Sequence, residues 1–287
     1  MGRELCALST AAADVFSRAD RVLGFPLSQL CFEGPRELLD DTANTQPAIL
    51  TVSVAALQAM GERWREAAFV AGHSLGEFSA LVAAGALTFE EALLLVRERG
   101  RLMKEAGQRS PGGMAAVIGL DAAAVEEACA QARQASGGYV GVANDNCPGQ
   151  VVISGDETAL QAGIEAAKEA GARRVARLAV SIAAHSPLMA EAAAAFQQVL
   201  ESVTIRPPST PFIANATASP LTAPEQIREA LGRQLTSPVR WTESLRWMID
   251  HGAARFIEIG PGEVLTGLLR RTDSAVEGLT TTMALQP

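Results

Sequence analysis

A serine between two glycines is the clearest sign of chemistry in this sequence. Residues 72–76 read Gly-His-Ser-Leu-Gly and directly follow the apolar run 67–71. After a buried strand, this spacing is typical of a sharp turn into a helix that exposes the central hydroxyl, here that of Ser74, as a nucleophile. The N–H of Leu75 would then face the negative charge that develops during attack on a carbonyl. The alternative is that the two glycines only shape a buried turn.

A nucleophilic serine needs a base, and the sequence offers only three histidines. His73 adjoins Ser74 and is expected to point away from it, while His251 is expected at an exposed helix end. His185 lies between a β-rich run and the helix predicted over 190–203. A loop of this kind can place a side chain in a cleft, which makes His185 the candidate base. The alternative is a core or helix-capping histidine.

Short β-rich runs alternate along the chain with Ala- and Glu-rich stretches of helical spacing. This alternation predicts the α/β fold class, with an α/β-hydrolase-like lobe built on a parallel sheet. The predicted strands cover residues 67–71, 114–118, 150–154 and 255–259, and the predicted helices cover 89–106, 121–134 and 190–203.

The stretch that follows the turn cluster Ser-Pro-Gly-Gly at 110–113 has a different order of elements. It reads strand, helix, strand, strand, helix, strand, which is the ferredoxin-like βαββαβ unit. We therefore predict a small ferredoxin-like subdomain at 112–180. It would be inserted into a large catalytic lobe made of residues 1–111 and 181–287.

Composition and charge limit the kinds of partner. With 32 Asp and Glu against 24 Lys and Arg, the 287-residue chain carries a formal net charge of −8. An acidic chain without a basic stripe is a poor ligand for nucleic acid or an anionic membrane. The N-terminal segment lacks the apolar core of a signal peptide, and no apolar run is long enough to span a membrane. The four cysteines include no CxxC pair, so we expect reduced thiols, no metal site and a cytoplasmic location.

Several motifs, spread in family order over nearly the whole chain, make the sequence resemble a known family. It is similar to the malonyl-CoA:acyl carrier protein transacylases and to the acyltransferase domains of polyketide synthases. The resemblance implies an acyltransferase that needs no cofactor. The motifs are Thr-Gln-Pro-Ala at 45–48, Gly-His-Ser-Leu-Gly-Glu at 72–77, Arg-Gly at 99–100, Gly-Met-Ala-Ala-Val-Ile-Gly at 113–119, Pro-Gly-Gln-Val-Val-Ile-Ser-Gly at 148–155, Ala-His-Ser-Pro-Leu-Met at 184–189, Ser-Pro-Val-Arg-Trp at 237–241 and Glu-Ile-Gly-Pro-Gly at 258–262.

The resemblance implies roles for individual residues. Ser74 would be the nucleophile and His185 the general base, and then the acid for the leaving thiol. The backbone carbonyl of Gln234 would orient the histidine in place of a carboxylate. Three further residues would line the substrate pocket, with a turn-forming role as the alternative for the two asparagines: His73, Asn144 and Asn146.

The resemblance also implies the residue that selects the acyl group. Arg99 would hold the free carboxylate of a malonyl group, for which the two parallel hydrogen bonds of a guanidinium are suited. On spacing alone, Arg97 and Arg101 would serve as well, and arginines on a charged helix are more often solvated. The choice of Arg99 therefore depends on the resemblance.

The sequence departs from the family pattern at its start. Family members begin with an apolar strand that ends in Gly-Gln-Gly-Ser-Gln, and the first Gln supplies a second oxyanion N–H. This sequence begins at Met1 with residues similar to those just after that motif. We therefore expect one oxyanion donor fewer, which costs serine enzymes roughly 10²–10³ in rate. We also expect an unpaired ladder in the buried parallel sheet, and so a lower stability.

The function implied by the resemblance is transfer of a malonyl group from malonyl-CoA to the phosphopantetheine thiol of acyl carrier protein. It would proceed through a malonyl-serine intermediate, supply fatty-acid synthesis and be carried out by a monomer. The open alternatives are a serine hydrolase or thioesterase of the α/β type, a trans-acting acyltransferase of a polyketide synthase, and a non-catalytic scaffold. Both proposed partners are acidic, so the cleft needs local positive charge. The candidates besides Arg99 are Arg173, Arg174, Arg240, Arg270 and Arg271.

Overall fold

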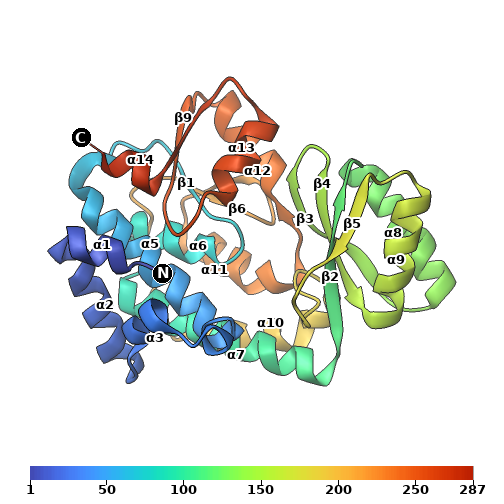
Figure 1. Cartoon of the computed structure of the whole chain (residues 1–287), viewed down its shortest axis with the longest axis horizontal. Coiled ribbons are helices and arrows are strands. Elements are labelled where there is room, and N and C mark those ends of the chain that lie inside the picture. The colour runs from blue at the N-terminus through green and yellow to red at the C-terminus, as the bar shows by residue number, and fades with distance from the viewer. Residues whose placement is uncertain (287) are drawn as a thin grey trace.

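The computed structural model describes residues 1–286 and has strands in three sheets with helices packed around them (Figure 1). This arrangement agrees with the predicted α/β class. The strands are β1 (Val70–Ala71), β2 (Gly112–Ile118), β3 (Val140–Cys147), β4 (Gln150–Asp156), β5 (Arg174–Arg177), β6 (Phe212–Ala214), β7 (Ser219–Leu221), β8 (Val239–Arg240), β9 (Arg255–Glu258) and β10 (Glu277–Thr280).

The helices include the three that the sequence predicts, each within a few residues of its expected ends. Short 3₁₀ helices cover Gly61–Trp64, Pro187–Met189 and Gln234–Thr236. The α-helices are α1 (Arg3–Leu8), α2 (Thr10–Leu23), α3 (Leu27–Glu33), α4 (Arg36–Leu39), α5 (Thr42–Met60), α6 (Gly76–Ala83), α7 (Phe89–Arg109), α8 (Ala122–Ser136), α9 (Glu157–Glu169), α10 (Ala190–Glu201), α11 (Pro224–Arg233), α12 (Trp241–Asp250), α13 (Val264–Thr272) and α14 (Thr281–Leu285).

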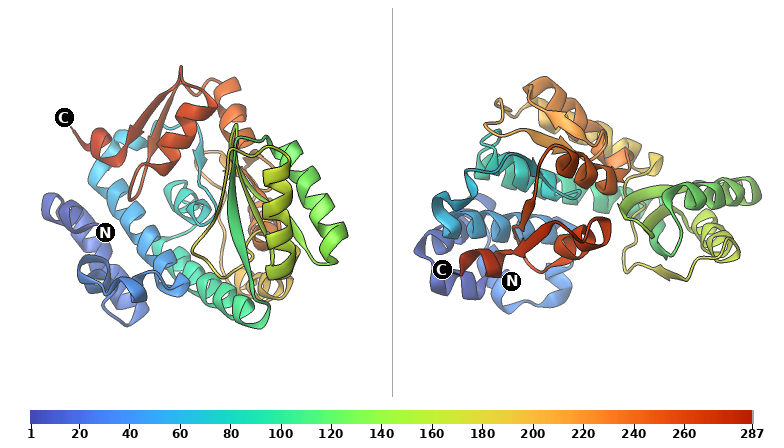
Figure 2. Two further views of the ribbon diagram at one scale, coloured as in Figure 1. Left: turned by 45° about the vertical axis from the view of Figure 1, so that its right-hand side comes forward. Right: turned by 90° about the horizontal axis from the view of Figure 1, so that it is seen from above.

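Strands β2 to β5 and helices α8 and α9 form the βαββαβ unit, called the small unit below. Its strands lie in the order β5-β2-β4-β3 with antiparallel neighbours, which is the ferredoxin-like arrangement. The two views of Figure 2 show it projecting from one end of the molecule, away from α1 to α3. A fifth strand, β8, joins the sheet parallel to β3 and was not predicted. The proposed domain boundaries at residues 112 and 180 remain a prediction.

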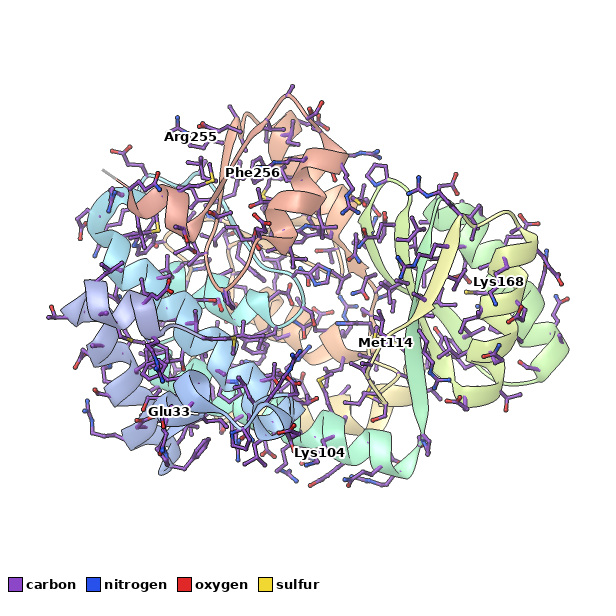
Figure 3. All side chains as sticks on the ribbon, in the orientation of Figure 1. Glu33, Lys104, Met114, Lys168, Arg255 and Phe256 are labelled. Atoms are coloured by element: carbon purple, nitrogen blue, oxygen red, sulfur yellow. The ribbon has the colours of Figure 1, made fainter. Side chains whose placement is uncertain are left out.

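The two faces of the small sheet pack against different neighbours, because side chains alternate along a strand. Ala115 and Val117 belong to a cluster with residues of α8 and α9. Met114 belongs instead to the large core that contains α2, α5 and α7. Figure 3 shows Met114 on the side of the sheet that faces the rest of the molecule. This packing joins the small unit to the large core.

The parallel pairing outside the small unit is divided between two sheets, whereas the sequence predicts one parallel sheet. In one sheet β1 runs parallel to β6, and β7 is antiparallel to β6; in the other, β9 runs parallel to β10. The strands of these sheets are short, and so are their ladders. β1 and β6 share only two residue pairs before the chain turns toward Ser74. Whether a further strand belongs to this lobe remains a prediction.

None of the helices formed by residues 1–286 is both long and apolar enough to cross a bilayer.

Candidate active site

Ser74 lies in a sharp turn between β1 and α6, called the elbow below (residues 72–76). Its φ is +51°, in the left-handed region that costs a residue with a Cβ about 1–3 kcal/mol. A Cβ added at Gly72 would lie 1.9 Å from the carbonyl carbon of Gly76, so the elbow closes only on a glycine at position 72. A Cβ at Gly76 would meet nothing within 4 Å. Of the two glycines of the motif, the turn therefore requires only Gly72, because a side chain at position 76 would point into open space.

The two glycines give a matched test of this geometry. Gly72→Ala is expected to lower the free energy of unfolding by about 3 kcal/mol or more, because the new methyl group overlaps backbone atoms that cannot rotate away. Gly76→Ala adds the same group in open space at the first residue of a helix, and is expected to be neutral or to stabilise by up to about 1 kcal/mol. Urea unfolding measures both, and equal midpoints for the two variants would contradict the geometry.

The hydroxyl of Ser74 is within hydrogen-bond distance of His185. Its Oγ is 2.9 Å from Nε2 of the ring. The other ring nitrogen, Nδ1, lies 3.0 Å from the carbonyl oxygen of Gln234 and 3.1 Å from that of Ser237. Because carbonyls only accept, Nδ1 carries the proton and Nε2 is free to accept one from Ser74. This is the arrangement of a nucleophile and its base, oriented by two backbone carbonyls in place of a carboxylate.

Burial keeps His185 neutral. The residue is 4% exposed. Its pKa is lowered from 6.5 to about 3, first by burial and then by the positive charge of Arg99. An imidazole that stays unprotonated at neutral pH is available as a base.

Arg99 is buried beside the nucleophile. Its Nη2 donates to Oγ of Ser74 at 3.1 Å, and its other donors reach side-chain oxygens of Gln46 at 2.8 Å and Gln234 at 2.7 and 3.0 Å. Within residues 1–286, none of the hydrogen-bond acceptors of the Arg99 guanidinium is a carboxylate. Burial lowers the pKa of Arg99 to about 10, so the guanidinium stays charged at neutral pH. A buried cation that makes no direct hydrogen bond to a carboxylate of the protein is suited to bind an acyl group that ends in one.

The packing of α7 distinguishes Arg99 from its two neighbouring arginines. A Cβ added at Gly100 would lie 2.5 Å from the carbonyl oxygen of Thr42, so α7 passes very close to the start of α5 at this point. Arg99 is carried into the interior there. Arg97 donates instead to a backbone carbonyl of α5, and Arg101 pairs with glutamates on the exposed face of α7.

A buried glutamate connects these residues. Glu77 is 1% exposed and accepts from the backbone N–H of Asn215 at 2.7 Å and from the side-chain amide of Gln234. The same amide donates to the carbonyl oxygen of Ser74 at 2.9 Å, so Gln234 links Glu77 to the elbow and to Arg99. Burial raises the pKa of Glu77 to about 7, although these hydrogen bonds and the charge of Arg99 oppose the rise.

The small unit reaches the elbow through Asn146. The Nε2–H of His73 donates to Oδ1 of Asn146 at 2.8 Å, and the ring lies edge-on to Trp241 with centroids 5.6 Å apart. His73 therefore makes its contacts away from Ser74. Asn144 lies on the same strand as Asn146, and both are buried. Their role as pocket residues stays a prediction.

The backbone N–H of Leu75 is positioned to donate to a substrate. Leu75 is the residue immediately before the first turn of α6, and within residues 1–286 its N–H has no hydrogen-bond acceptor. A free N–H at a helix N-terminus next to a nucleophile can stabilise an oxyanion.

His251 lies away from the contacts of Ser74 and His185. It is exposed after α12, and its ring stacks on Trp247 with centroids 3.8 Å apart.

The structure adds site residues to which sequence reasoning assigned no role. Three of them lie inside the motifs that carry the family resemblance, and this is the signal that could have found them. Asn215 lies in none of those motifs. The four residues are Gln46, Glu77, Asn215 and Ser237.

Known proteins are similar to this chain over nearly its whole length. A family model described as the acyl transferase domain matches residues 1–285. The malonyl CoA-acyl carrier protein transacylase of Bacillus subtilis is 45% identical over 273 residues, which cover 95% of this chain and 86% of the relative. The crystal structure of an acyl carrier protein S-malonyltransferase from Vibrio cholerae is 42% identical with a TM-score of 0.92, covering 96% of this chain and 90% of that one.

A third similar structure is that of a malonyl-transacylase in complex with its type II PKS acyl-carrier protein. It is 40% identical with a TM-score of 0.94 and covers 99% of this chain and 94% of that chain. The similarity therefore extends over nearly the whole chain in both sequence and structure. The chain belongs to the acyl transferase family, and its relatives in that family include malonyl CoA-acyl carrier protein transacylases.

Proposed function

We propose that this chain transfers a malonyl group from malonyl-CoA to the phosphopantetheine thiol of acyl carrier protein, with a malonyl ester on Ser74 as the intermediate. One observation carries the proposal: Oγ of Ser74 lies 2.9 Å from the base His185 and 3.1 Å from the cation Arg99. The first contact suits acyl transfer through a serine. The second suits an acyl group with a free carboxylate. The names of the relatives support the same reaction.

The first half-reaction makes the malonyl ester. Nε2 of His185 takes the proton of Ser74 while Oγ attacks the thioester carbonyl of malonyl-CoA. The carbonyl oxygen becomes an oxyanion, to which the free N–H of Leu75 donates. The carbon–sulfur bond then breaks, and coenzyme A leaves as a thiol with the proton that His185 held.

The second half-reaction runs the same steps with a different thiol. His185 takes the proton of the phosphopantetheine thiol, and the sulfur attacks the ester carbonyl. The bond from the acyl carbon to Oγ breaks, and Ser74 recovers its proton from His185. In neither half-reaction does the ester pass to water, and this is what separates a transferase from a hydrolase.

Arg99 is proposed to select malonyl over uncharged acyl groups. Arg99→Lys keeps a positive charge but loses the planar pair of donors. We expect kcat/KM for malonyl-CoA to fall about 10- to 100-fold, the worth of a charged hydrogen bond, and the preference for malonyl-CoA over acetyl-CoA to fall with it. Arg101→Lys, two residues along the same helix and exposed, is the matched control and should stay within about 2-fold. An unchanged preference in Arg99→Lys would exclude this role.

The lowered pKa of His185 predicts the acid limb of the pH profile. The base form is lost only as the pH falls through the folded-state value of about 3, not through 6.5. We therefore expect kcat/KM for malonyl-CoA to stay constant from about pH 6.5 to about pH 5, where a histidine of ordinary pKa would lose about 15-fold. Arg99→Gln removes one cause of the low value and should move the acid limb to higher pH. A wild-type profile that already falls between these pH values would contradict the assignment.

Intact-protein mass spectrometry tests the proposed function directly. Mixing with malonyl-CoA should add one malonyl group to the chain, and this group should persist until holo acyl carrier protein is added and then appear on the carrier. A hydrolase or thioesterase would instead release free malonate without any carrier. A non-catalytic scaffold would not be acylated at all. Either of these results would overturn the proposal.

Local positive charge at the site allows a chain whose net charge is −8 to bind the two proposed anionic partners. Arg99 supplies it inside the site. Of the other arginines predicted to supply positive charge to the cleft, Arg240 is paired with a glutamate of α12, and Arg271 donates to Gln150. The remaining ones are exposed, and they are Arg173, Arg174 and Arg270.

We also propose that the reaction supplies fatty-acid synthesis. The alternative is polyketide synthesis, which the structural similarity to a transacylase bound to a type II PKS carrier favours. Rates measured with a fatty-acid and a polyketide carrier protein at equal concentration distinguish the two. A clear preference for the polyketide carrier would overturn the first choice.

We further propose that the chain acts as a monomer in the cytoplasm. Its four cysteines are free thiols, as expected of a reducing compartment. Light scattering on the purified protein and fractionation of cells test the two parts of this proposal. A stable dimer or a membrane-bound fraction would contradict the corresponding part.

A further inference from the structure

The side chain of Asn215 has no part in the reaction described above, yet both of its polar atoms contact the elbow. Oδ1 accepts from the backbone N–H of Ser74 at 2.7 Å, and Nδ2 donates to the carbonyl oxygen of Gly72 at 2.7 Å. A backbone N–H only donates and a carbonyl only accepts, so this orientation of the amide is the one that satisfies both. Asn215 is 1% exposed, so water does not compete for these contacts.

Asn215 owes its position to strand β6. In the parallel pairing of β1 with β6, Val70 lies opposite Phe212 and Ala71 lies opposite Ile213. The ladder ends there, and Asn215 follows the last residue of β6 directly. Beyond the ladder, its side-chain amide makes the hydrogen bonds that the backbone of a neighbouring strand would otherwise make. It accepts from the N–H of Ser74 and donates to the carbonyl of Gly72.

The backbone of Asn215 is itself held on both sides. Its N–H donates to Oε1 of Glu77 at 2.7 Å, and its carbonyl oxygen accepts from the N–H of Arg240 at 3.0 Å. Glu77 belongs to α6, which begins where the elbow ends. Asn215 therefore joins the two ends of the turn, through Gly72 on the side of β1 and through Glu77 on the side of α6. Ser74, with its positive φ of +51°, lies between these two attachments.

We propose that Asn215 is a positioning residue for acyl transfer. Its amide holds the backbone of Ser74 in the strained conformation that brings Oγ to 2.9 Å from His185. This inference rests on the proposed function, because the step that it governs is acylation of Ser74. Without the amide, the N–H of Ser74 and the carbonyl of Gly72 lose their partners and the turn is free to relax. A displacement of a reacting atom by about 1 Å costs on the order of 100-fold in rate.

Single-turnover acylation separates this role from binding. Asn215→Ala is expected to slow acylation at saturating malonyl-CoA by about 100-fold, while the Kd for malonyl-CoA changes by less than about 3-fold, since a purely positional loss falls on the chemical step. Asn215→Asp preserves the size of the side chain and an acceptor for Ser74. It places a second acceptor against the carbonyl of Gly72, so it should also slow acylation. Val15→Ala, which shortens a buried side chain of α2, is the control for general destabilisation and should lower Tm without slowing acylation.

The proposal is overturned if Asn215→Ala is acylated at the wild-type rate, or if the substitution weakens only the binding of malonyl-CoA. It is also overturned if Val15→Ala, at the same loss of Tm, slows acylation as much as Asn215→Ala does. If the wild-type chain itself forms no malonyl ester, the proposed function has failed, and this result is distinct from either of the others.

Hydrogen exchange on the wild-type protein tests the same contact without any variant. The amide of Ser74 should exchange slowly because Asn215 accepts its hydrogen bond, and the amide of Leu75 should exchange faster because it has no acceptor within residues 1–286. Exchange at Ser74 as fast as at Leu75 overturns the proposal even if neither Asn215 variant folds.

Discussion

Replacement of Ser74 by alanine is expected to lower the rate of malonyl transfer by about 10⁶, the loss found when a serine hydrolase loses its nucleophile. The substitution removes a single atom, and that atom is the one contacted by His185 at 2.9 Å and Arg99 at 3.1 Å. Alanine retains the Cβ, and the backbone contacts of the elbow with Asn215 and Gln234 do not involve the hydroxyl. The loss should therefore be one of chemistry and not of folding. A coupled assay for released coenzyme A measures the rate, and the mass of the protein shows whether any malonyl ester forms.

The next serine of the same segment provides the control. Ser79 lies on α6, and its hydroxyl is buried without a hydrogen-bond partner within residues 1–286. Ser79→Ala should keep full activity and a stability equal to or slightly above that of the wild-type chain, since it removes an unsatisfied polar group. A Ser74→Ala protein that still gains a malonyl group on adding malonyl-CoA would show that the acylated residue is elsewhere.

Local patterns of residues were sufficient to predict the elbow and the small unit. The run from residue 67 to 76 places Ser74 because a strand, a glycine turn and a helix are each determined by nearby residues. The order of elements in 112–180 likewise follows from local periodicity, and the observed strand order β5-β2-β4-β3 agrees with it. The same reasoning predicted one parallel sheet in the large lobe. The parallel pairs β1–β6 and β9–β10 agree with this, but their division between two sheets could not be predicted, because pairing between strands far apart in the chain is not a local property.

The contacts that hold the site together were out of reach for the same reason. The hydrogen bond from Ser74 to Asn215 joins residues 141 positions apart, and that from Gln234 to Glu77 joins residues 157 apart. Arg99 could not be preferred to Arg97 or Arg101 by spacing, because what selects it is the close approach of α7 to α5 at Gly100. The resemblance to a family supplied that choice, and the buried position of Arg99 gives it a physical reason.

His185→Ala is expected to reduce the rate by about 10⁶ as well, but the two losses differ in kind. Ser74→Ala removes the site of the intermediate, whereas His185→Ala leaves the hydroxyl and removes only its base. Both half-reactions use His185, so formation of the malonyl ester and its transfer to the carrier should slow together. His251→Ala, in which the histidine is exposed and stacked on Trp247, is the matched control and should retain wild-type rates.

The pH dependence of the His185→Ala protein makes the prediction specific. With no base, Oγ of Ser74 reacts only after its proton is lost to solvent, so the residual acylation rate should rise about tenfold for each unit of pH, while the wild-type rate stays level. The alkoxide that forms is not left without stabilisation, because Nη2 of Arg99 donates to Oγ at 3.1 Å. Arg99→Lys added to His185→Ala should therefore reduce the residual rate further, even with an acyl group that has no carboxylate. A His185→Ala protein that is acylated at the wild-type rate, with a level pH profile, would mean that another group takes the proton and that His185 is not the base.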